Sequence, residues 1–233
     1  MDSTHETIVA VVVAAGSGTR LKSLTPKPFV QLGDKPLFAH SLAVFDRHPR
    51  ISAIVIVVHA DHADYARNYC NACGLVKPLS IVKGGKERWQ SVQAGVAAAG
   101  AAEWVLVHDC ARPFVSAQVI DSILEKMAQF SCVITVTPET DTVRLVSGDR
   151  ALETVDRTKI VRVGTPQLFR RATLVEALSE GAAMNPPPTD EAMLMQRINV
   201  PVGIAWGDPL NFKITTPQDM QLAEALYALL SRK

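Results

Sequence analysis

The stretch from Val11 to Phe29, VVVAAGSGTRLKSLTPKPF, constrains this chain most, because it joins an apolar run to a turn of small residues and two isolated cations. The run from Ile8 to Val13 is apolar without alternation, which is typical of a strand that is covered on both faces in a parallel sheet. We therefore predict that this run is the central strand of the fold.

The small residues after this strand are Ala14, Ala15, Gly16 and Gly18. Side chains of this size let backbone N–H groups approach a ligand and point at phosphate oxygens. The spacing fits neither a dinucleotide fingerprint, which needs glycine where Leu21 stands, nor a P-loop, which needs Gly-Lys from that position. The turn alone leaves two interpretations open, a phosphate cradle and a tight connection from strand to helix.

Two cations, Arg20 and Lys27, follow the turn. Lys27 lies between Pro26 and Pro28, whose fixed φ values stiffen the loop. A rigidly held lysine is suited to stabilising charge on a ligand, although a solvated loop lysine gives the same pattern. We interpret the whole stretch as a cradle for a nucleotide triphosphate.

Beyond this stretch, strand and helix patterns alternate. Apolar runs predict strands at 51–58, 79–82, 104–108 and 132–136, and periodic patterns predict helices at 36–45, 61–73, 88–99 and 217–230, with another after a Ser116 cap. This alternation predicts an α/β fold with a Rossmann-like, mostly parallel sheet flanked by helices. Because no low-complexity linker interrupts it, we expect one domain over residues 1–233.

The pattern changes between Thr137 and Gly164. Val143 to Val146 and Ala151 to Val155 flank turn residues and predict a β-hairpin, within an inserted β-arm at about 138–160. Such an arm has little core of its own and gains stability by packing on a partner. We therefore expect a homodimer.

Three later segments carry helix or strand signals. Thr165-Pro166 and Thr216-Pro217 each have the pattern of a capped helix start with proline in the first turn. Thr189, at the start of Thr189-Asp190-Glu191, is most simply an N-cap, although its hydroxyl could also meet a substrate hydroxyl. Lys213 lies between apolar neighbours, as in an alternating strand, and points either toward a pocket or toward water.

Composition excludes several classes of partner. The formal net charge is +1 and the basic residues are scattered, so the chain has no broad basic field for nucleic acid. The longest apolar run, Ile8 to Ala15, is too short to cross a bilayer. We expect a cytoplasmic protein that binds neither nucleic acid nor membrane.

The four cysteines are at positions 70, 73, 110 and 132. Cys70 and Cys73 have the spacing of a redox pair or of half a zinc site, but Cys110 and Cys132 are too far apart to complete a zinc ribbon. The alternative is a set of thiols that pack in the fold or stay idle in a reducing compartment. We favour this alternative.

Asp109 and Arg112 place a carboxylate and a guanidinium at the end of a predicted strand. The carboxylate suits magnesium held jointly with a triphosphate, and the arginine suits bidentate phosphate recognition, whereas the plain alternative is an ion pair at a strand end. Gly84-Gly85 before a helix either forms a turn or permits close approach to a base or sugar. No GxSxG motif or histidine-activated nucleophile is evident, so the inventory fits nucleotidyl transfer by charge neutralisation.

Together these segments closely resemble the 2-C-methyl-D-erythritol 4-phosphate cytidylyltransferases of the non-mevalonate isoprenoid pathway, nearly end to end. The motifs that carry the resemblance are AAGSGTR (14–20), PK (26–27), GGKERWQSV (84–92), VHDCARPF (107–114), DT (141–142), TVDR (154–157), TPQLF (165–169), TDE (189–191) and NFKITTPQD (211–219). Each motif is weak alone, but the set in this order is specific.

The resemblance implies a nucleotidyltransferase fold and a role for each matched residue. The implied contacts of CTP are Ala14, Ala15, Gly16, Gly18, Gly85, Lys86, Arg88 and Ser91. The implied catalytic residues are Arg20, Lys27, Asp109 and Lys213, with Arg20 and Lys27 on the α-phosphate and Asp109 on Mg²⁺ or another divalent cation. The implied contacts of methylerythritol phosphate are Arg112, Thr142, Thr165, Thr189 and Lys213, with Arg157 reaching over from the arm of the other subunit.

The sequence departs from the family pattern at Cys110, where alanine is usual, at Pro28, where glutamine is frequent, and at 161–164, which commonly contains tryptophan. The last departure touches the polyol pocket, so the alternatives are a cytidylyltransferase for another polyol phosphate such as ribitol 5-phosphate, or a sugar-1-phosphate nucleotidylyltransferase. A catalytically dead nucleotide-binding regulator would be expected to lack Arg20, Lys27 or Asp109, and all three are present.

Overall fold

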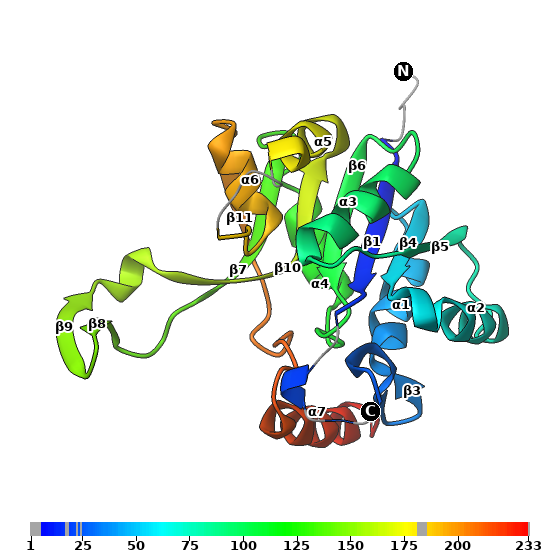
Figure 1. The fold of residues 1–233 in the computed structure, drawn as a ribbon, viewed down its shortest axis with the longest axis horizontal. Coiled ribbons are helices and arrows are strands. Elements are labelled where there is room, and N and C mark those ends of the chain that lie inside the picture. The colour runs from blue at the N-terminus through cyan, green and yellow to red at the C-terminus, as the bar shows by residue number, and fades with distance from the viewer. Residues whose placement is uncertain (1–5, 17–18, 22, 24, 181–185, 233) are drawn as a thin grey trace.

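The computed structural model describes residues 6–16, 19–21, 23, 25–180 and 186–232. In these ranges the main sheet has seven strands in the order β11-β7-β10-β6-β1-β4-β5 (Figure 1). The strands are β1 (Ile8–Ala14), β4 (Ala53–Val58), β5 (Leu79–Lys83), β6 (Trp104–Asp109), β7 (Cys132–Pro138), β10 (Val161–Arg170) and β11 (Val202–Trp206). β10 runs antiparallel to β6 and β7, whereas the other neighbouring pairs are parallel.

β1 is an interior strand, paired in parallel with β4 and β6. Its side chains alternate between two apolar clusters, with Ile8 and Val12 in one and Val9 and Val13 in the other. Because both faces of a parallel strand are covered, the strand is apolar at every position. β1 is thus buried inside the sheet, but the prediction that it is the central strand was wrong, because β6 occupies the middle of the sheet.

Helices cover both faces of the sheet (Figure 1). One apolar cluster receives side chains from α1 (Leu37–Arg47), α2 (Ala63–Ala72) and α4 (Ala117–Leu124). The other receives side chains from α3 (Arg88–Ala98), α5 (Arg171–Glu180) and α6 (Glu191–Arg197). The predicted α/β fold with a mostly parallel sheet between helices is thereby confirmed, as is the Ser116 cap, whose side chain accepts from the Val119 N–H.

The closing helix α7 (Pro217–Leu230) lies beyond the carboxyl end of β1 (Figure 1). It begins with a capping box in which the Thr216 hydroxyl accepts from the Asp219 N–H and the Asp219 carboxylate accepts from the Thr216 N–H. It contacts β2 (Gln31–Leu32), which pairs with β3 (Lys35–Pro36). Short 3₁₀ turns lie at η1 (Thr19–Leu21), η2 (Lys27–Phe29), η3 (Ala60–His62) and η4 (Arg157–Lys159).

The predicted hairpin forms from β8 (Val143–Ser147) and β9 (Arg150–Val155), which pair antiparallel. Together with η4 it projects away from the sheet as an arm (Figure 1). Its apolar side chains Leu145, Val146 and Leu152 are 54%, 69% and 47% exposed. An arm of this shape buries little apolar surface within its own chain.

Three predictions about local structure were wrong. Thr165-Pro166 lies inside β10, and the next helix starts at Arg171. The capping pattern is local, whereas β10 pairs on both sides, and the register shift between Val163 and Gln167 accommodates a proline without an N–H.

The other two errors concern Thr189 and Lys213. The N-cap of α6 is Asp190, whose carboxylate accepts from the Met193 N–H at 3.1 Å, while the Thr189 hydroxyl donates to the Met193 sulfur at 2.9 Å. Lys213 lies in irregular chain rather than in a strand, because the Ile214 N–H donates to the carbonyl of Ala111 in the loop after β6. In the described ranges, each helix is too short or too polar to cross a membrane.

Candidate active site

The candidate site lies where β1 and β6 end side by side. Val13 of β1 pairs in register with Asp109, the last residue of the parallel strand β6. Ligands of open α/β sheets bind outside the carboxyl ends of the strands. The predicted position of Asp109, at the carboxyl end of a parallel strand, is confirmed.

A cavity of about 200 Å³, which we call the glycine-loop cavity, opens beside these strand ends. The predicted residues that line it are Ala15, Gly16, Arg20, Lys27, Gly85, Lys86, Arg88, Ser91, Asp109 and Lys213. Ala14 is the buried last residue of β1 and lines a neighbouring cavity instead. Gly18 lies outside the described residues.

A tight turn at Gly84 holds two walls of this cavity together. A Cβ on Gly84 would lie 2.5 Å from the Cβ of Ala15 and 2.7 Å from the Oγ of Ser91, so this approach requires glycine. The Ser91 hydroxyl accepts from the Gly85 N–H at 3.2 Å and donates to the Glu87 carbonyl at 3.3 Å. The turn therefore places the first residues of α3, the positive end of its dipole, at the cavity.

Asp109 is the electrostatic centre of the cavity. Its Oδ1 accepts from Nε and NH2 of Arg88 at 3.1 and 3.0 Å, and its Oδ2 accepts from Nζ of Lys213 at 2.7 Å. Burial by itself would raise the pKa of Asp109, but the charges of Arg88 and Lys213 outweigh it and hold that pKa well below its usual range. Asp109 is therefore ionised. Its ion pairs are with Arg88 and Lys213, whereas the ion-pair alternative had supposed a pair with Arg112.

Lys27 and Arg20 add positive charge to the same cavity. Lys27 is held in η2 between two prolines, and Pro28 and Phe29 of that turn are buried. Burial lowers the pKa of Lys27 below the ordinary value for lysine, and the charges of Lys213 and Arg20 act in the same direction. An anion that neutralised this group of cations would bind favourably, because their mutual repulsion would be relieved.

A second cavity of about 200 Å³, which we call the threonine cavity, adjoins the first. It contains four of the predicted acceptor-binding residues, Arg112, Thr165, Thr189 and Lys213. The two cavities share Arg88, Asp109 and Lys213. A ligand in one cavity therefore lies against the same charged residues as a ligand in the other.

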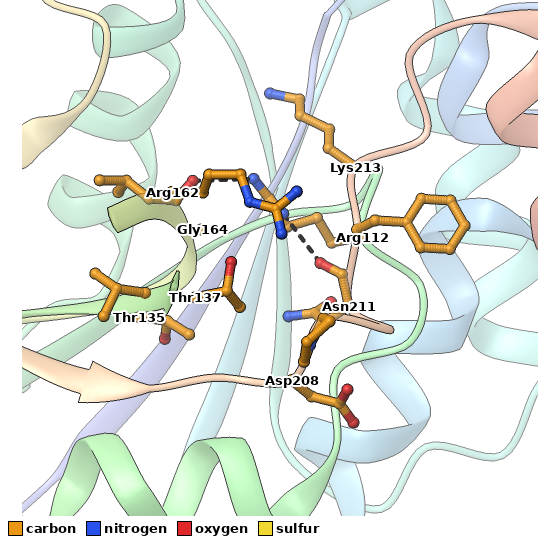
Figure 2. A pocket seen from close by; sticks show the side chains of 12 residues that line it. Arg112, Thr135, Thr137, Arg162, Gly164, Asp208, Asn211 and Lys213 are labelled. Atoms are coloured by element: carbon orange, nitrogen blue, oxygen red, sulfur yellow. Dashed lines mark hydrogen bonds between the residues drawn. The ribbon is translucent and has the colours of Figure 1, made fainter. Parts of the chain in front are cut away.

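Arg112 is held by backbone carbonyls rather than by a carboxylate. Its NH1 donates to the Asn211 carbonyl at 3.0 Å and its NH2 to the Val163 carbonyl at 3.4 Å. Figure 2 shows the Asn211 hydrogen bond, and shows Arg112, Arg162 and Lys213 around a third cavity, of about 260 Å³. The positive charge of Arg112 is thus oriented by the fold while remaining available to an anion.

Thr142 and Arg157 lie on the arm and line neither the glycine-loop cavity nor the threonine cavity. Arg157 is in η4, where its NH1 donates to the carbonyl of Thr140 in the same arm. Because the arm projects from the body of its own chain (Figure 1), it does not bring these two residues to the site described above.

The cysteines form no pair. Cys73 donates a hydrogen bond to the Cys70 carbonyl, and all four cysteines are free thiols. Burial raises the pKa values of Cys70, Cys110 and Cys132 to about 12. In the described ranges no three His, Cys, Asp or Glu side chains are grouped as metal ligands.

Comparison with known proteins identifies the family. The model of the 2-C-methyl-D-erythritol 4-phosphate cytidylyltransferase family matches residues 8–228. An enzyme of that name from Halalkalibacterium halodurans is 37% identical over 96% of this chain and 98% of its own length. An enzyme of the same name from Geobacillus thermodenitrificans is 36% identical over 94% of this chain and 96% of its own length. The chain belongs to the 2-C-methyl-D-erythritol 4-phosphate cytidylyltransferase family.

Solved structures agree with this assignment. A 4-diphosphocytidyl-2C-methyl-D-erythritol synthase from Anaerococcus prevotii superposes with a TM-score of 0.84 at 26% identity, over 96% of this chain and 99% of that one. A 2-C-methyl-D-erythritol 4-phosphate cytidylyltransferase from Thermus thermophilus superposes with a TM-score of 0.74 at 30% identity, over 94% and 98%. The predicted family resemblance is confirmed.

Most departures of this cytidylyltransferase family member from the expected motifs lie at the cavities. Pro28 and the buried Cys110 line the glycine-loop cavity. Val163 and Gly164 line the threonine cavity, and Arg162 lines the third. Pro28, Arg162, Val163 and Gly164 are thus placed where they would contact a ligand, whereas Cys110 also belongs to a core cluster and Val161 packs against the other.

Sequence reasoning missed three polar residues around the threonine cavity of this family member. Gln167 donates through Nε2 to the Gly164 carbonyl at 3.2 Å and to Asp190 Oδ2 at 3.1 Å. Glu191 is fully buried and binds Arg88. All three residues belong to the TPQLF and TDE motifs, so the sequence contained a signal for them. Only the tertiary contacts show that they differ in role from other strand and helix residues.

The Thr165 hydroxyl supports Asp109 from β10. It accepts from the Asp109 N–H at 3.1 Å and shares a hydrogen bond of 3.1 Å with Nδ1 of His108.

We predict that Thr165→Val, which keeps the shape but removes the acceptor, lowers the free energy of unfolding by about 1–3 kcal/mol, because a buried N–H loses its partner. Urea unfolding measures this. Thr165→Ser should retain most of the stability, and equal losses in both variants would contradict the assigned hydrogen bond.

Proposed function

We propose that this chain transfers a cytidylyl group from CTP to 2-C-methyl-D-erythritol 4-phosphate, giving 4-diphosphocytidyl-2-C-methyl-D-erythritol and pyrophosphate. The observation that carries the proposal is the junction of two cavities at Arg88, Asp109 and Lys213. One cavity offers small residues and cations to a triphosphate, and the other offers Arg112 and hydroxyl groups to a polyol phosphate. The names of the relatives favour this acceptor over ribitol 5-phosphate.

The proposed reaction is a single displacement at phosphorus. A phosphate oxygen of the acceptor attacks the α-phosphorus of CTP in line, a new P–O bond forms, and the bond to pyrophosphate breaks. The attacking phosphate oxygen is already anionic near neutral pH, so the step requires no general base. This agrees with a site in which His108, the histidine next to Asp109, is buried in the core.

In the proposed reaction the protein positions the two substrates and neutralises the charge of their phosphates. Lys27 and Arg20 neutralise charge that grows on the α-phosphate and on the leaving pyrophosphate. Lys213 lines both cavities, and its positive charge reduces the repulsion between the attacking phosphate and the triphosphate. The turn after β1, which contains Ala15 and Gly16, and the first turn of α3 hold the triphosphate through backbone N–H groups.

The residues fit a divalent cation that is held mainly by the nucleotide. Mg²⁺ in such sites takes one or two carboxylates together with substrate phosphates, and Asp109 supplies an ionised carboxylate in the glycine-loop cavity. We infer that Asp109 holds Mg²⁺ or another divalent cation, which would neutralise charge on the triphosphate.

We further propose that two copies of the chain form a homodimer through the arm. The exposed Leu145, Val146 and Leu152 would be buried against the partner, and Thr142 and Arg157 would reach the threonine cavity of the other subunit. This proposal accounts for an arm that projects from its own chain (Figure 1). The cytoplasmic location stays a prediction.

The function is tested by pyrophosphate release from CTP and Mg²⁺ with methylerythritol phosphate, ribitol 5-phosphate or a sugar 1-phosphate as acceptor. We expect the highest kcat/KM with methylerythritol phosphate. A preference for ribitol 5-phosphate would overturn the acceptor assignment and leave the donor assignment standing.

We predict that Arg20→Ala and Lys27→Ala each lower kcat by about 10²–10³ while changing CTP affinity much less, because both residues act on charge that grows in the transition state. Turnover is measured by pyrophosphate release and CTP affinity by calorimetry. Arg67→Ala removes an exposed arginine on α2 and serves as the control. Loss of CTP affinity with unchanged kcat would contradict these roles.

We also predict that Arg157 acts in the neighbouring subunit. Mixing an Arg157→Ala chain with a Lys27→Ala chain should restore activity, because half of the sites in a mixed dimer would combine an intact Lys27 with an intact Arg157 from the partner. Activity is followed after subunit exchange, which labelled chains report independently. Confirmed exchange without any recovery would show that Arg157 serves its own chain.

A further inference from the structure

Four charged side chains form a continuous series that runs from the buried Glu191 to three residues shared by the two cavities. Both carboxylate oxygens of Glu191 accept from NH1 of Arg88 at 2.7 Å. Nε and NH2 of Arg88 donate to Asp109, which also accepts from Lys213. The order is Glu191, Arg88, Asp109 and Lys213, so the signs alternate and the formal charges cancel.

The members of this series differ in their access to a ligand. The Glu191 side chain is 1% exposed and lines neither cavity, whereas Arg88 and Asp109 line both. A buried carboxylate is costly unless it is paired, and removing one partner of a buried pair leaves an uncompensated charge. Glu191 therefore lines neither cavity itself, and its hydrogen bonds connect it to them through Arg88.

The position of Glu191 is fixed by its helix. The neighbouring side chains Leu194 and Met195 of α6 are fully buried in the core cluster beneath α5 and α6. Asp190 caps the helix and accepts from Gln167 of β10. The carboxylate that meets Arg88 is thus attached to a packed element rather than to a loop.

Glu191 and Asp109 bind different parts of the Arg88 guanidinium. NH1 of Arg88 is occupied by Glu191, and the remaining edge of the guanidinium contacts a single oxygen of Asp109. Without the negative charge of Glu191, Asp109 alone would neutralise Arg88, and the guanidinium would be free to pair with both Asp109 oxygens. The other Asp109 oxygen is held by Lys213, whose side chain is 37% exposed.

We propose that Glu191 is a positioning residue that anchors Arg88 and so keeps the Asp109 carboxylate available to the divalent cation of the nucleotide. This inference rests on the proposed function, since it assumes that CTP and a divalent cation bind at Asp109. It assigns a functional role to the glutamate of the TDE motif, whose side chain lines neither the glycine-loop cavity nor the threonine cavity. The merely structural alternative is that Glu191 only stabilises the fold.

The test compares Glu191→Gln with Leu194→Ala, which removes a buried side chain of the same helix without touching Arg88. CTP affinity is measured by calorimetry in EDTA and again with Mg²⁺, and the unfolding midpoint is measured for each variant. Mutating a group that supports a metal ligand lowers metal affinity by about 10–100-fold. For Glu191→Gln we expect CTP affinity in EDTA to be retained, and the Mg²⁺ concentration that gives half of the Mg²⁺-dependent gain in CTP affinity to rise by about tenfold or more.

Leu194→Ala should lower the unfolding midpoint and leave the Mg²⁺ dependence of CTP binding unchanged. Glu191→Asp keeps the charge on a shorter side chain and should give an intermediate shift, and it replaces the glutamine variant if that chain does not fold. A wild-type Mg²⁺ dependence in both Glu191 variants, or the same shift in Leu194→Ala, would overturn the inference. Failure of the unaltered protein to bind CTP would instead overturn the proposed function.

Discussion

The ion pairs of Asp109 are the interaction on which the site depends. A carboxylate at the buried end of β6 stays charged mainly because Arg88 and Lys213 approach it from α3 and from the chain before α7. Those two cations come from segments far apart in the sequence, so the ion pairs also fix how the segments meet. The boundary between the two cavities is a direct consequence, because all three residues line both.

This arrangement separates rigid from adjustable parts. Glu191 and the packed helix α6 hold Arg88 on one side of Asp109, whereas Lys213 comes from irregular chain and is more exposed. A site that neutralises phosphate charge benefits from fixed cations, because they need no reorganisation as the transition state forms. If Lys213 left its ion pair with Asp109 when a ligand bound, it could contact the ligand instead.

Much of the site was predictable because its motifs follow strands directly. The glycine turn follows β1 and the Asp109 motif follows β6, so the carboxyl ends of two parallel strands bring them together. Thr165 was different. Its threonine-proline pattern predicted a helix start, but pairing of β10 with β6 and β7 placed it in a strand, where its hydroxyl supports Asp109. Local helix propensity was overridden there by sheet formation. At Lys213 the predicted strand did not form, and the neighbouring Ile214 N–H donates instead to the carbonyl of Ala111 in the loop after β6.

The sequence alone determined the alternation of buried strands and helices, the hairpin of the arm, and the two segments that supply Lys27 and Asp109. These depend on apolar periodicity and on turn residues, which are local properties of the chain. The tertiary structure alone decided that Asp109 pairs with Arg88 and Lys213 rather than with Arg112, and that Glu191 secures Arg88 from beneath. Those choices depend on distances between elements that are far apart in the sequence, and residue spacing along the chain carries no record of such distances.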